Sequence, residues 1–309
     1  MSKLNSKDVL RSDQFTKEEI DRIMETARRY EAAIDAGEVL DTMNGMVLST
    51  LFYEPSTRTR LSFETAMLRL GGRVITVAEA KSSSAAKGES LHDTIKTVEG
   101  YADVIVLRHP QIGAAKEAAD ATDRPVLNAG DGAGQHPTQS LLDLYTILKE
   151  QGKVDGLTIA LAGDLRNGRT VHSLALLLSN YDVEFLFVAP DALRMPGEII
   201  EQVRAAGIKV TETADLKEAL RTADVLYMTR IQRERFEDPQ EYERLKDAFV
   251  LRAAMLDGAK DGLTIMHPLP RVNEIATDVD AYAGAAYFRQ SANGVPIRMA
   301  LLALVTGRA

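Results

Sequence analysis

The chain alternates short apolar runs with longer segments in which apolar residues recur every three or four positions. The first run spans 46–52, and after it Phe63, Ala66, Met67 and Leu70 have the spacing of one helix face. Further strands are predicted at 74–77, 104–107, 125–130, 158–162, 183–189, 208–212, 224–229 and 263–266. This alternation is typical of parallel sheets that are covered by helices on both faces.

The alternation stops and restarts near Gln151-Gly152, a pair that breaks the preceding helical segment. A chain of 309 residues exceeds what one hydrophobic core usually fills. We therefore predict an α/β fold of two doubly wound domains, 1–150 and 151–290, each with a parallel sheet flanked by helices. The segment 291–309 is strongly helical and has no strand of its own, so we expect it to pack back on the first domain.

Composition excludes several classes of function. Hydrophobic residues make up 45% of the chain and charged residues 27%, as in ordinary globular proteins. The net charge of −8 argues against a general nucleic-acid-binding surface, so any positive site is local. Without cysteine, the chain has no disulfides, thiolate metal sites or cysteine nucleophiles. No segment resembles a signal peptide or a membrane span, so we expect a cytoplasmic protein with neither nucleic acid nor membrane as a partner.

A cluster of hydroxyl and guanidinium groups lies where the first strand turns into a helix, at Ser56-Thr57-Arg58-Thr59-Arg60. The first N–H groups of a helix have no partner inside it, and the helix dipole favours negative charge there. Because arginine binds phosphate oxygens two at a time, this turn predicts a phosphate site. An ordinary Ser/Thr helix cap explains a single hydroxyl but not the whole cluster.

Polar residues also follow other predicted strands, at the sheet edge where ligands bind in open parallel sheets. The first half of the chain has Arg108 and 136–139 there, and the second has Arg169, Arg230 and 267–271. Neither a carboxylate pair of the glycosidase kind nor a metal-binding histidine spacing occurs near them. The pattern indicates a site that holds several anions, and we expect no metal and no cofactor.

Simpler interpretations of these residues stay open. Arg108 could be a surface cation at the end of an edge strand, and His136 could merely cap the helix that follows it. The polar segment 81–89 has the composition of a flexible surface loop. The segment 163–168 lacks the G-x-G-x-x-G spacing of a dinucleotide loop, which argues against a dinucleotide-dependent dehydrogenase.

Three segments, 56–60, 136–139 and 267–270, resemble signatures of the aspartate/ornithine carbamoyltransferase family, in the same order and with similar gaps. The likeness covers nearly the whole chain. The segments 87–89 and 230–232, and a proline at 268 where ornithine enzymes typically have cysteine, favour members that use aspartate. The resemblance implies transfer of a carbamoyl group from carbamoyl phosphate to L-aspartate, giving N-carbamoyl-L-aspartate and phosphate, the committed step toward pyrimidines.

The resemblance also implies roles for individual residues. The phosphate would be held by Ser56, Thr57, Arg58, Thr59 and Arg108. The carbamoyl oxygen would be polarised by Thr59, Arg108 and His136. The carbamoyl amino group would bind to Gln139 and to the backbone of Leu269 and Pro270. The residues expected to act directly in the reaction are Arg58, Thr59, Arg108, His136 and Lys87.

On the aspartate side, Arg169 and Arg230 would bind the two carboxylates with support from Gln232. Ser83 and Lys87 would reach into the site from a neighbouring chain of a homotrimer, as the family analogy implies. A separate regulatory chain is a further possible partner. Glu54 is expected to orient one of the arginines.

Two other functions remain as alternatives. A transferase of the same fold could act on another amine such as ornithine, but a cationic side chain calls for a carboxylate partner, whereas Arg169 and Arg230 suit an acidic substrate. A non-catalytic anion-binding protein could keep the fold, but binding alone would not need His136 and Gln139.

Overall fold

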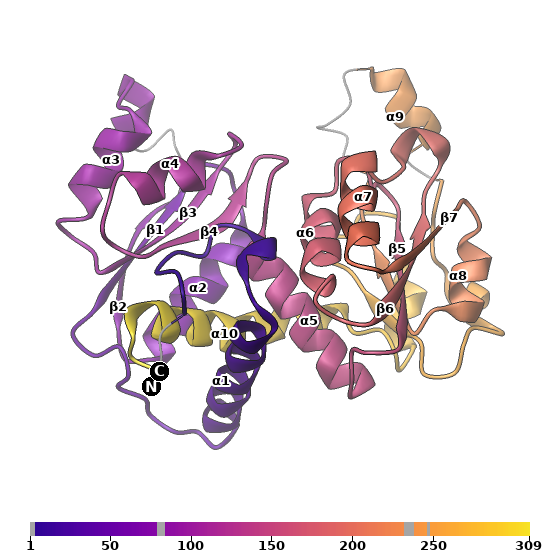
Figure 1. Ribbon diagram of the computed structural model, residues 1–309, viewed down its shortest axis with the longest axis horizontal. Helices are drawn as coiled ribbons and strands as arrows, with labels where there is room; N and C mark the ends of the chain where they lie inside the picture. Colours follow the sequence, from indigo (N-terminus) through magenta and orange to yellow (C-terminus); the bar gives the residue numbers. More distant parts are fainter. Residues whose placement is uncertain (1–3, 79–83, 232–237, 246–247) are drawn as a thin grey trace. The chain divides into compact units, whose positions relative to one another are not determined.

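The computed structural model describes residues 4–78, 84–231, 238–245 and 248–309. The chain forms two compact units: unit 1 comprises Met1–Leu142 and Asn293–Ala309, and unit 2 comprises Asp143–Ala292. Each unit is built on a parallel sheet flanked by helices (Figure 1). The predicted fold of two α/β sheets, with a C-terminal helix that packs back on the first, is confirmed.

The unit 1 sheet has the strand order β2-β1-β3-β4, and every pair is parallel. Its strands are β1 (Val47–Phe52), β2 (Arg73–Val77), β3 (Val104–His109) and β4 (Val126–Asp131). Helices α3 (Leu91–Val98) and α4 (Ala114–Asp120) pack on the face where Leu51 and Leu107 are buried. Side chains alternate between the two faces of a strand, so Thr50 points to the face opposite Leu51. Helix α2 (Thr57–Arg69) covers that face, where the Thr50 hydroxyl donates to Glu64 Oε1 at 3.2 Å.

Three longer helices complete the list: α1 (Lys17–Asp35) belongs to unit 1, whereas α5 (Pro137–Gln151) and α10 (Tyr287–Thr306) each include residues of both units. Helix α1 begins with a capping box in which Thr16 and Glu19 each accept the other's backbone N–H. Helix α10 contacts α2 where the Arg298 guanidinium lies over the Phe63 ring, 4.9 Å from its centroid. The expected start near 291 is wrong by one turn, because α10 already begins at Tyr287.

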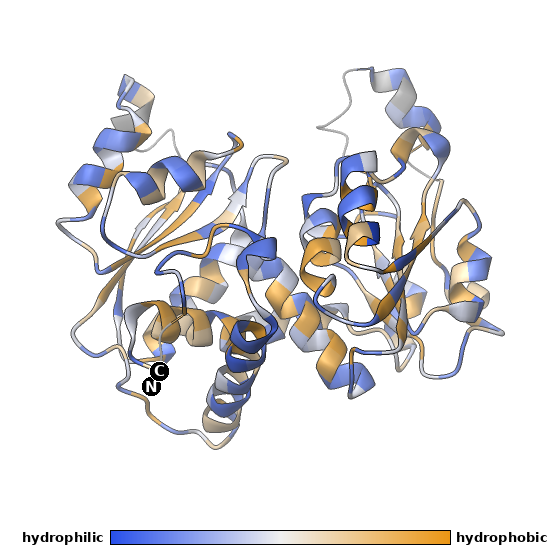
Figure 2. Ribbon diagram, in the orientation of Figure 1, coloured by the Kyte–Doolittle hydropathy of each residue, from blue (hydrophilic) through white to orange (hydrophobic). Residues whose placement is uncertain are grey.

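The unit 2 sheet has the order β7-β6-β5-β8-β9 and is again parallel throughout. Its strands are β5 (Leu157–Ala162), β6 (Val183–Val188), β7 (Lys209–Thr213), β8 (Val225–Met228) and β9 (Thr264–Met266), and its other helices are α6 (Arg169–Leu178), α7 (Gly197–Ala205), α8 (Leu216–Thr222) and α9 (Pro239–Leu245). Leu220 of α8 packs against Ala160 and Leu226 of the sheet. Figure 2 shows the apolar strands beneath helices with hydrophilic outer faces.

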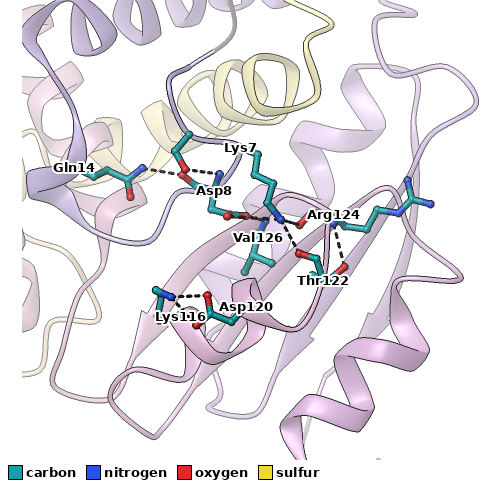
Figure 3. Close-up of polar contacts among 9 residues, drawn as sticks. Lys7, Asp8, Gln14, Lys116, Asp120, Thr122, Arg124 and Val126 are labelled. Carbon is teal, nitrogen blue, oxygen red and sulfur yellow. Dashed lines mark hydrogen bonds and ion pairs between the residues drawn. The ribbon is translucent and has the colours of Figure 1, made fainter.

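The N-terminal segment covers the outer edge of β4 (Figure 3). Val9 donates to Val126 O at 2.9 Å and accepts from Asn128 N at 2.8 Å, so its backbone continues the sheet. Asp8 Oδ1 accepts from Val126 N at 2.8 Å, and Lys7 Nζ donates to Thr122 O at 2.6 Å. An edge strand that is covered in this way cannot pair with another chain. Burial raises the pKa of the Asp8 carboxyl.

We expect Asp8→Asn to change the pH dependence of stability. The raised pKa of Asp8 means that its protonated form favours folding, and this contribution is lost as pH rises through the folded pKa. Asparagine keeps an oxygen that can accept from Val126 but carries no charge. In denaturant titrations the variant should gain stability relative to wild type between about pH 3 and pH 7. A stability difference that is the same at both pH values would contradict this account.

Candidate functional site

The start of α2 carries the hydroxyl side chains of Ser56, Thr57 and Thr59. Ser56 occupies the N-cap position with extended backbone, φ −157° and ψ 100°, yet its side chain makes no capping hydrogen bond. Thr57 is exposed and Thr59 is buried on the first turn. Ordinary helix capping is therefore the wrong explanation for Ser56, and its hydroxyl remains available to a ligand.

Arg58 and Arg60 both lie on this turn but differ in their contacts with carboxylates. Arg60 Nε lies 3.8 Å from Glu64 Oε1, one turn along the helix. Partial burial lowers the pKa of Arg58, and no carboxylate in the described part of the chain contributes to that shift. A guanidinium that has lost water without gaining a carboxylate, beside the first N–H groups of a helix, attracts an anion. Of the two, Arg58 is therefore the arginine without an ion pair to a carboxylate in the described chain, and its role in a phosphate site stays a prediction.

Arg108 lies beside this turn because β3 pairs with β1, where it is the register partner of Phe52. Its side chain is buried, with 9% exposed, and Nη1 donates to Ala129 O at 3.1 Å. Nη2 contacts the Glu54 carboxylate. The prediction that Glu54 orients one of the arginines is confirmed for Arg108. A buried guanidinium held by a carbonyl and a carboxylate keeps one orientation and needs little reorganisation to meet a ligand.

The segment after β4 is held from several sides. Asp131 Oδ1 accepts from Gln135 N at 2.7 Å, and Oδ2 accepts from Gly113 N at 2.9 Å. Ser12 N donates to Gln135 Oε1 at 3.2 Å, which ties the N-terminal segment to the same loop. His136 follows directly and is buried, with 3% exposed.

Helix α5 begins at Pro137, directly after His136, so Gln139 lies in its first turn. His136 O accepts from Gln139 N at 3.0 Å, so the backbone of His136 opens the helix. The imidazole and the Gln139 side chain are both buried near the helix start. Proline suits the first helical position, because an N–H there would have no partner.

Three predicted groups of residues thus lie at or just beyond the carboxyl ends of neighbouring strands β1, β3 and β4. We refer to Ser56–Thr59, Arg108, His136 and Gln139 as the unit 1 site. Lys87 is exposed at the end of a short 3-10 helix, Ser84–Lys87, between β2 and α3. No contact links it to the unit 1 site within the described residues, and Ser83 lies outside them.

Unit 2 has a second set of predicted residues at the carboxyl ends of its strands. Arg169 is the first residue of α6 after β5, and Arg230 follows the neighbouring strand β8. Both side chains are half-buried. Leu269 and Pro270 follow β9, which pairs with β8. We refer to Arg169, Arg230, Leu269 and Pro270 as the unit 2 site; Gln232 lies outside the described residues.

The turn before Arg169 depends on a glycine. Gly163 has φ +117°, and a Cβ there would lie 2.4 Å from Thr229 O. Thr229 N in turn donates to Ala162 O at 2.8 Å, so the turn cannot move away without breaking the pairing that places Arg230. The glycine therefore permits close approach of the two segments that carry the arginines.

Gly163→Ala should lower the free energy of unfolding by about 2–4 kcal/mol, because strain at positive φ and overpacking against backbone add. Gly207 provides a matched control, since it has φ +85° but nothing within 4 Å of its Cβ position. Gly207→Ala should lower the free energy by only about 1 kcal/mol. Equal losses in urea titrations of the two variants would show that close approach to Thr229 is unimportant.

Leu269 has φ 56°, an uncommon conformation for a residue with a side chain. Its N–H donates to His267 Nδ1 at 2.8 Å. The polar residues around His267, namely Asp143, Tyr227, Glu274 and Gln290, are buried and were not expected from the sequence. They come from separate segments, so neither spacing nor periodicity could have identified them.

The described residues contain neither a candidate membrane span nor a metal-binding cluster. No helix there is both long and apolar enough to cross a membrane. Likewise, no three His, Cys, Asp or Glu residues in the described ranges are grouped so that they could hold a metal ion.

Comparison with known proteins identifies relatives over both units. Residues 7–149 match the family model described as aspartate/ornithine carbamoyltransferase, carbamoyl-P binding domain, and residues 155–305 match that of the Asp/Orn binding domain. The aspartate carbamoyltransferase catalytic subunit of Thermococcus kodakarensis is 56% identical over 301 residues, which cover 97% of each chain.

Solved structures agree with these matches. The catalytic subunit of M. jannaschii aspartate transcarbamoylase has a TM-score of 0.90 and 53% identity, covering 96% of this chain and 97% of that one. Aspartate transcarbamoylase from Trypanosoma cruzi, in complex with carbamoyl phosphate and aspartate, has a TM-score of 0.93 and 44% identity, covering 97% of each chain. The chain belongs to the aspartate/ornithine carbamoyltransferase family.

Proposed function

We propose that the protein is an aspartate carbamoyltransferase, which transfers the carbamoyl group of carbamoyl phosphate to the amino group of L-aspartate in pyrimidine biosynthesis. The observation that carries the proposal is the unit 1 site, where Arg58 has no carboxylate partner in the described chain and Ser56 does not cap its helix. Family membership over both units, with relatives that act on aspartate, supports the same reaction.

In this proposal the phosphate of carbamoyl phosphate binds at the start of α2. Ser56, Thr57 and Thr59 supply hydroxyl groups, and Arg58 supplies a bidentate cation. Arg108, held by Glu54, adds a second positive charge from the neighbouring strand. Phosphate brings its negative charge to the positive end of the helix dipole, which stabilises both the substrate and the leaving group.

The carbamoyl group is then attacked directly by the aspartate amine. The new C–N bond forms as charge builds on the carbamoyl oxygen, where Thr59, Arg108 and His136 act as hydrogen-bond donors. The tetrahedral intermediate collapses as the C–O bond to phosphate breaks and the proton of the attacking amine passes to the leaving phosphate. Donors that are fixed in advance at such an oxygen contribute a factor of about 10²–10³ in rate, and holding both substrates in contact contributes as much or more.

Aspartate binds, in this proposal, through the unit 2 arginines. Arg169 and Arg230 each pair with one carboxylate, and Gln232 supports them. The carbamoyl amino group binds to Gln139 and to the backbone of Leu269 and Pro270. Two arginines suit a dicarboxylate, whereas the side chain of ornithine would require a carboxylate partner.

We also propose a homotrimer in which Ser83 and Lys87 of one chain complete the site of its neighbour. Leu61 and Leu68 of α2 are 48% and 60% exposed, and Ile75 of the edge strand β2 is 40% exposed. Apolar side chains on an unpaired sheet edge and the adjacent helix favour burial against another subunit. The cytoplasmic location and a regulatory chain stay predictions from the sequence.

A product assay tests the function. The protein is incubated with carbamoyl phosphate and either L-aspartate or L-ornithine, and the products are separated. We expect carbamoyl aspartate and phosphate in equal amounts, and no citrulline. Formation of citrulline would still support the proposed binding of carbamoyl phosphate, but it would contradict the proposed binding of aspartate by Arg169 and Arg230. If folded protein forms neither product, it binds anions without catalysing transfer.

A further inference from the structure

A series of buried hydrogen bonds in unit 2 leads to the segment after β9. Tyr227 OH donates to Asp143 Oδ2 at 2.9 Å, and Gln290 Nε2 donates to Asp143 Oδ1 at 2.7 Å. Gln290 Oε1 accepts from the backbone N–H of His267 at 2.8 Å. All four residues are buried. Buried hydrogen bonds that connect several segments in this way hold those segments in one arrangement.

His267 continues this network with a defined tautomer. Because Nδ1 accepts from Leu269 N at 2.8 Å, the ring proton is on Nε2, which lies 2.7 Å from Glu274 Oε1. Burial raises the pKa of Glu274, but the contact with His267 and the nearby backbone N–H groups outweigh it and hold that pKa below its usual value. Glu274 therefore faces His267 as a carboxylate.

The network also determines which backbone groups this segment can offer to a ligand. Glu274 Oε2 accepts from Val272 N and Asn273 N, both at 3.1 Å. The N–H groups of His267 and Leu269 are directed to buried side chains, and the other two residues of 267–270 are prolines, which have no N–H. A ligand that meets the backbone of 267–270 therefore meets hydrogen-bond acceptors only.

We infer that His267 and Glu274 are positioning residues that set the choice of acyl phosphate. By directing the N–H groups of the segment inward, they leave an acceptor surface that fits the NH₂ of a carbamoyl group and rejects the methyl of an acetyl group. A methyl group would leave desolvated carbonyl oxygens without a donor, which is the kind of mismatch that discriminates strongly between isosteric substrates. The inference rests on the proposed function, since it concerns the donor of the same reaction.

The test compares two replacements of His267. In His267→Asn, the side-chain oxygen can take the position of Nδ1 and accept from Leu269 N. In His267→Gln, the longer side chain reaches toward Glu274 but has no acceptor at the Nδ1 position. The measured quantity is the ratio of kcat/KM for carbamoyl phosphate to that for acetyl phosphate, with saturating L-aspartate. Where acetyl transfer is too slow to measure, the inhibition constant of acetyl phosphate replaces its kcat/KM.

We expect His267→Gln to lower this ratio about tenfold or more, and His267→Asn to lower it less. His172→Gln is the matched control: this histidine of unit 2 contacts Leu165 O through Nε2 at 2.7 Å and lies in a different segment. The control should keep the wild-type ratio even if it unfolds at lower temperature. Glu274→Gln, which removes one of two carboxylate oxygens, should also lower the ratio and serves as the test if His267→Gln does not fold.

The outcomes separate the inference from the proposed function. An unchanged ratio in folded His267→Gln or Glu274→Gln would overturn the inference, as would an equal fall in the His172→Gln control. A greater fall in His267→Asn than in His267→Gln would overturn the role of the Leu269 hydrogen bond. If the wild-type protein forms no carbamoyl aspartate, the proposed function itself is wrong.

Discussion

Arg58→Ala should reduce kcat/KM for carbamoyl phosphate by about three orders of magnitude while leaving the fold unchanged. The side chain lies at the start of α2, has lost part of its hydration and has no carboxylate partner in the described chain. Its positive charge is therefore available to the phosphate, and removing a charged donor at a transferring phosphate commonly costs a factor of about 10³ or more. Because no internal contact is lost, the thermal midpoint should stay near the wild-type value.

Arg60→Ala is the matched control for this experiment. Arg60 lies on the same turn but pairs with Glu64 along the helix, at 3.8 Å. Loss of that pair should cost about 0.2–0.5 kcal/mol of stability and little activity. Steady-state kinetics of both variants, with circular dichroism to verify folding, decide the matter. Near-normal turnover of Arg58→Ala would refute the phosphate assignment.

Arg230→Ala should raise the KM for L-aspartate by about 10- to 100-fold, because a hydrogen bond between two charged groups is lost. Arg230 follows β8. The backbone N–H of Thr229 donates to Ala162 O at 2.8 Å, and this hydrogen bond fixes the start of the segment. The KM for carbamoyl phosphate should change much less, since its proposed ligands are mostly in unit 1.

Arg204→Ala serves as the control for Arg230→Ala. Arg204 is exposed on α7, so its removal changes the net charge of unit 2 by the same amount. If both variants raise the KM for aspartate equally, the effect is one of overall charge. An unchanged aspartate KM in Arg230→Ala would exclude this arginine from the aspartate site.

Most strands were predictable because burial on both faces leaves a continuous apolar run in the sequence, whereas the edge strands β2 and β7 are partly exposed. All nine expected strands occur in the described chain within two residues of the predicted limits. Helix starts were harder to predict from the sequence. The glycine-rich segment before His136 reads as a loop, and only the three-dimensional contacts of Asp131 and Gln135 show that it is a rigid lead into α5.

The candidate site was predictable only in part. Strand ends and the Ser56–Thr59 turn are local patterns, so these candidate residues could be placed at the sheet edges from the sequence, whereas the roles of Gln139, Leu269 and Pro270 rest on the family resemblance and stay predictions. The difference between Arg58 and Arg60 is local as well, because Glu64 lies four residues after Arg60 on the same helix. Glu274 and Asp143 carry no local signal, since their partners come from other segments. Gln232 and Ser83 lie outside the described residues and stay predictions.

The return of α10 to unit 1 has a consequence for biosynthesis. Unit 2 is one continuous stretch, 143–292, whereas unit 1 needs residues 293–309, which leave the ribosome after all of unit 2. Ile297, Leu301 and Leu302 are fully buried, so the nascent unit 1 exposes their apolar contact surface until residues 293–309 have been translated. Unit 2 can therefore complete its fold first, and the N-terminal half of the chain is the part that most needs chaperone protection during synthesis.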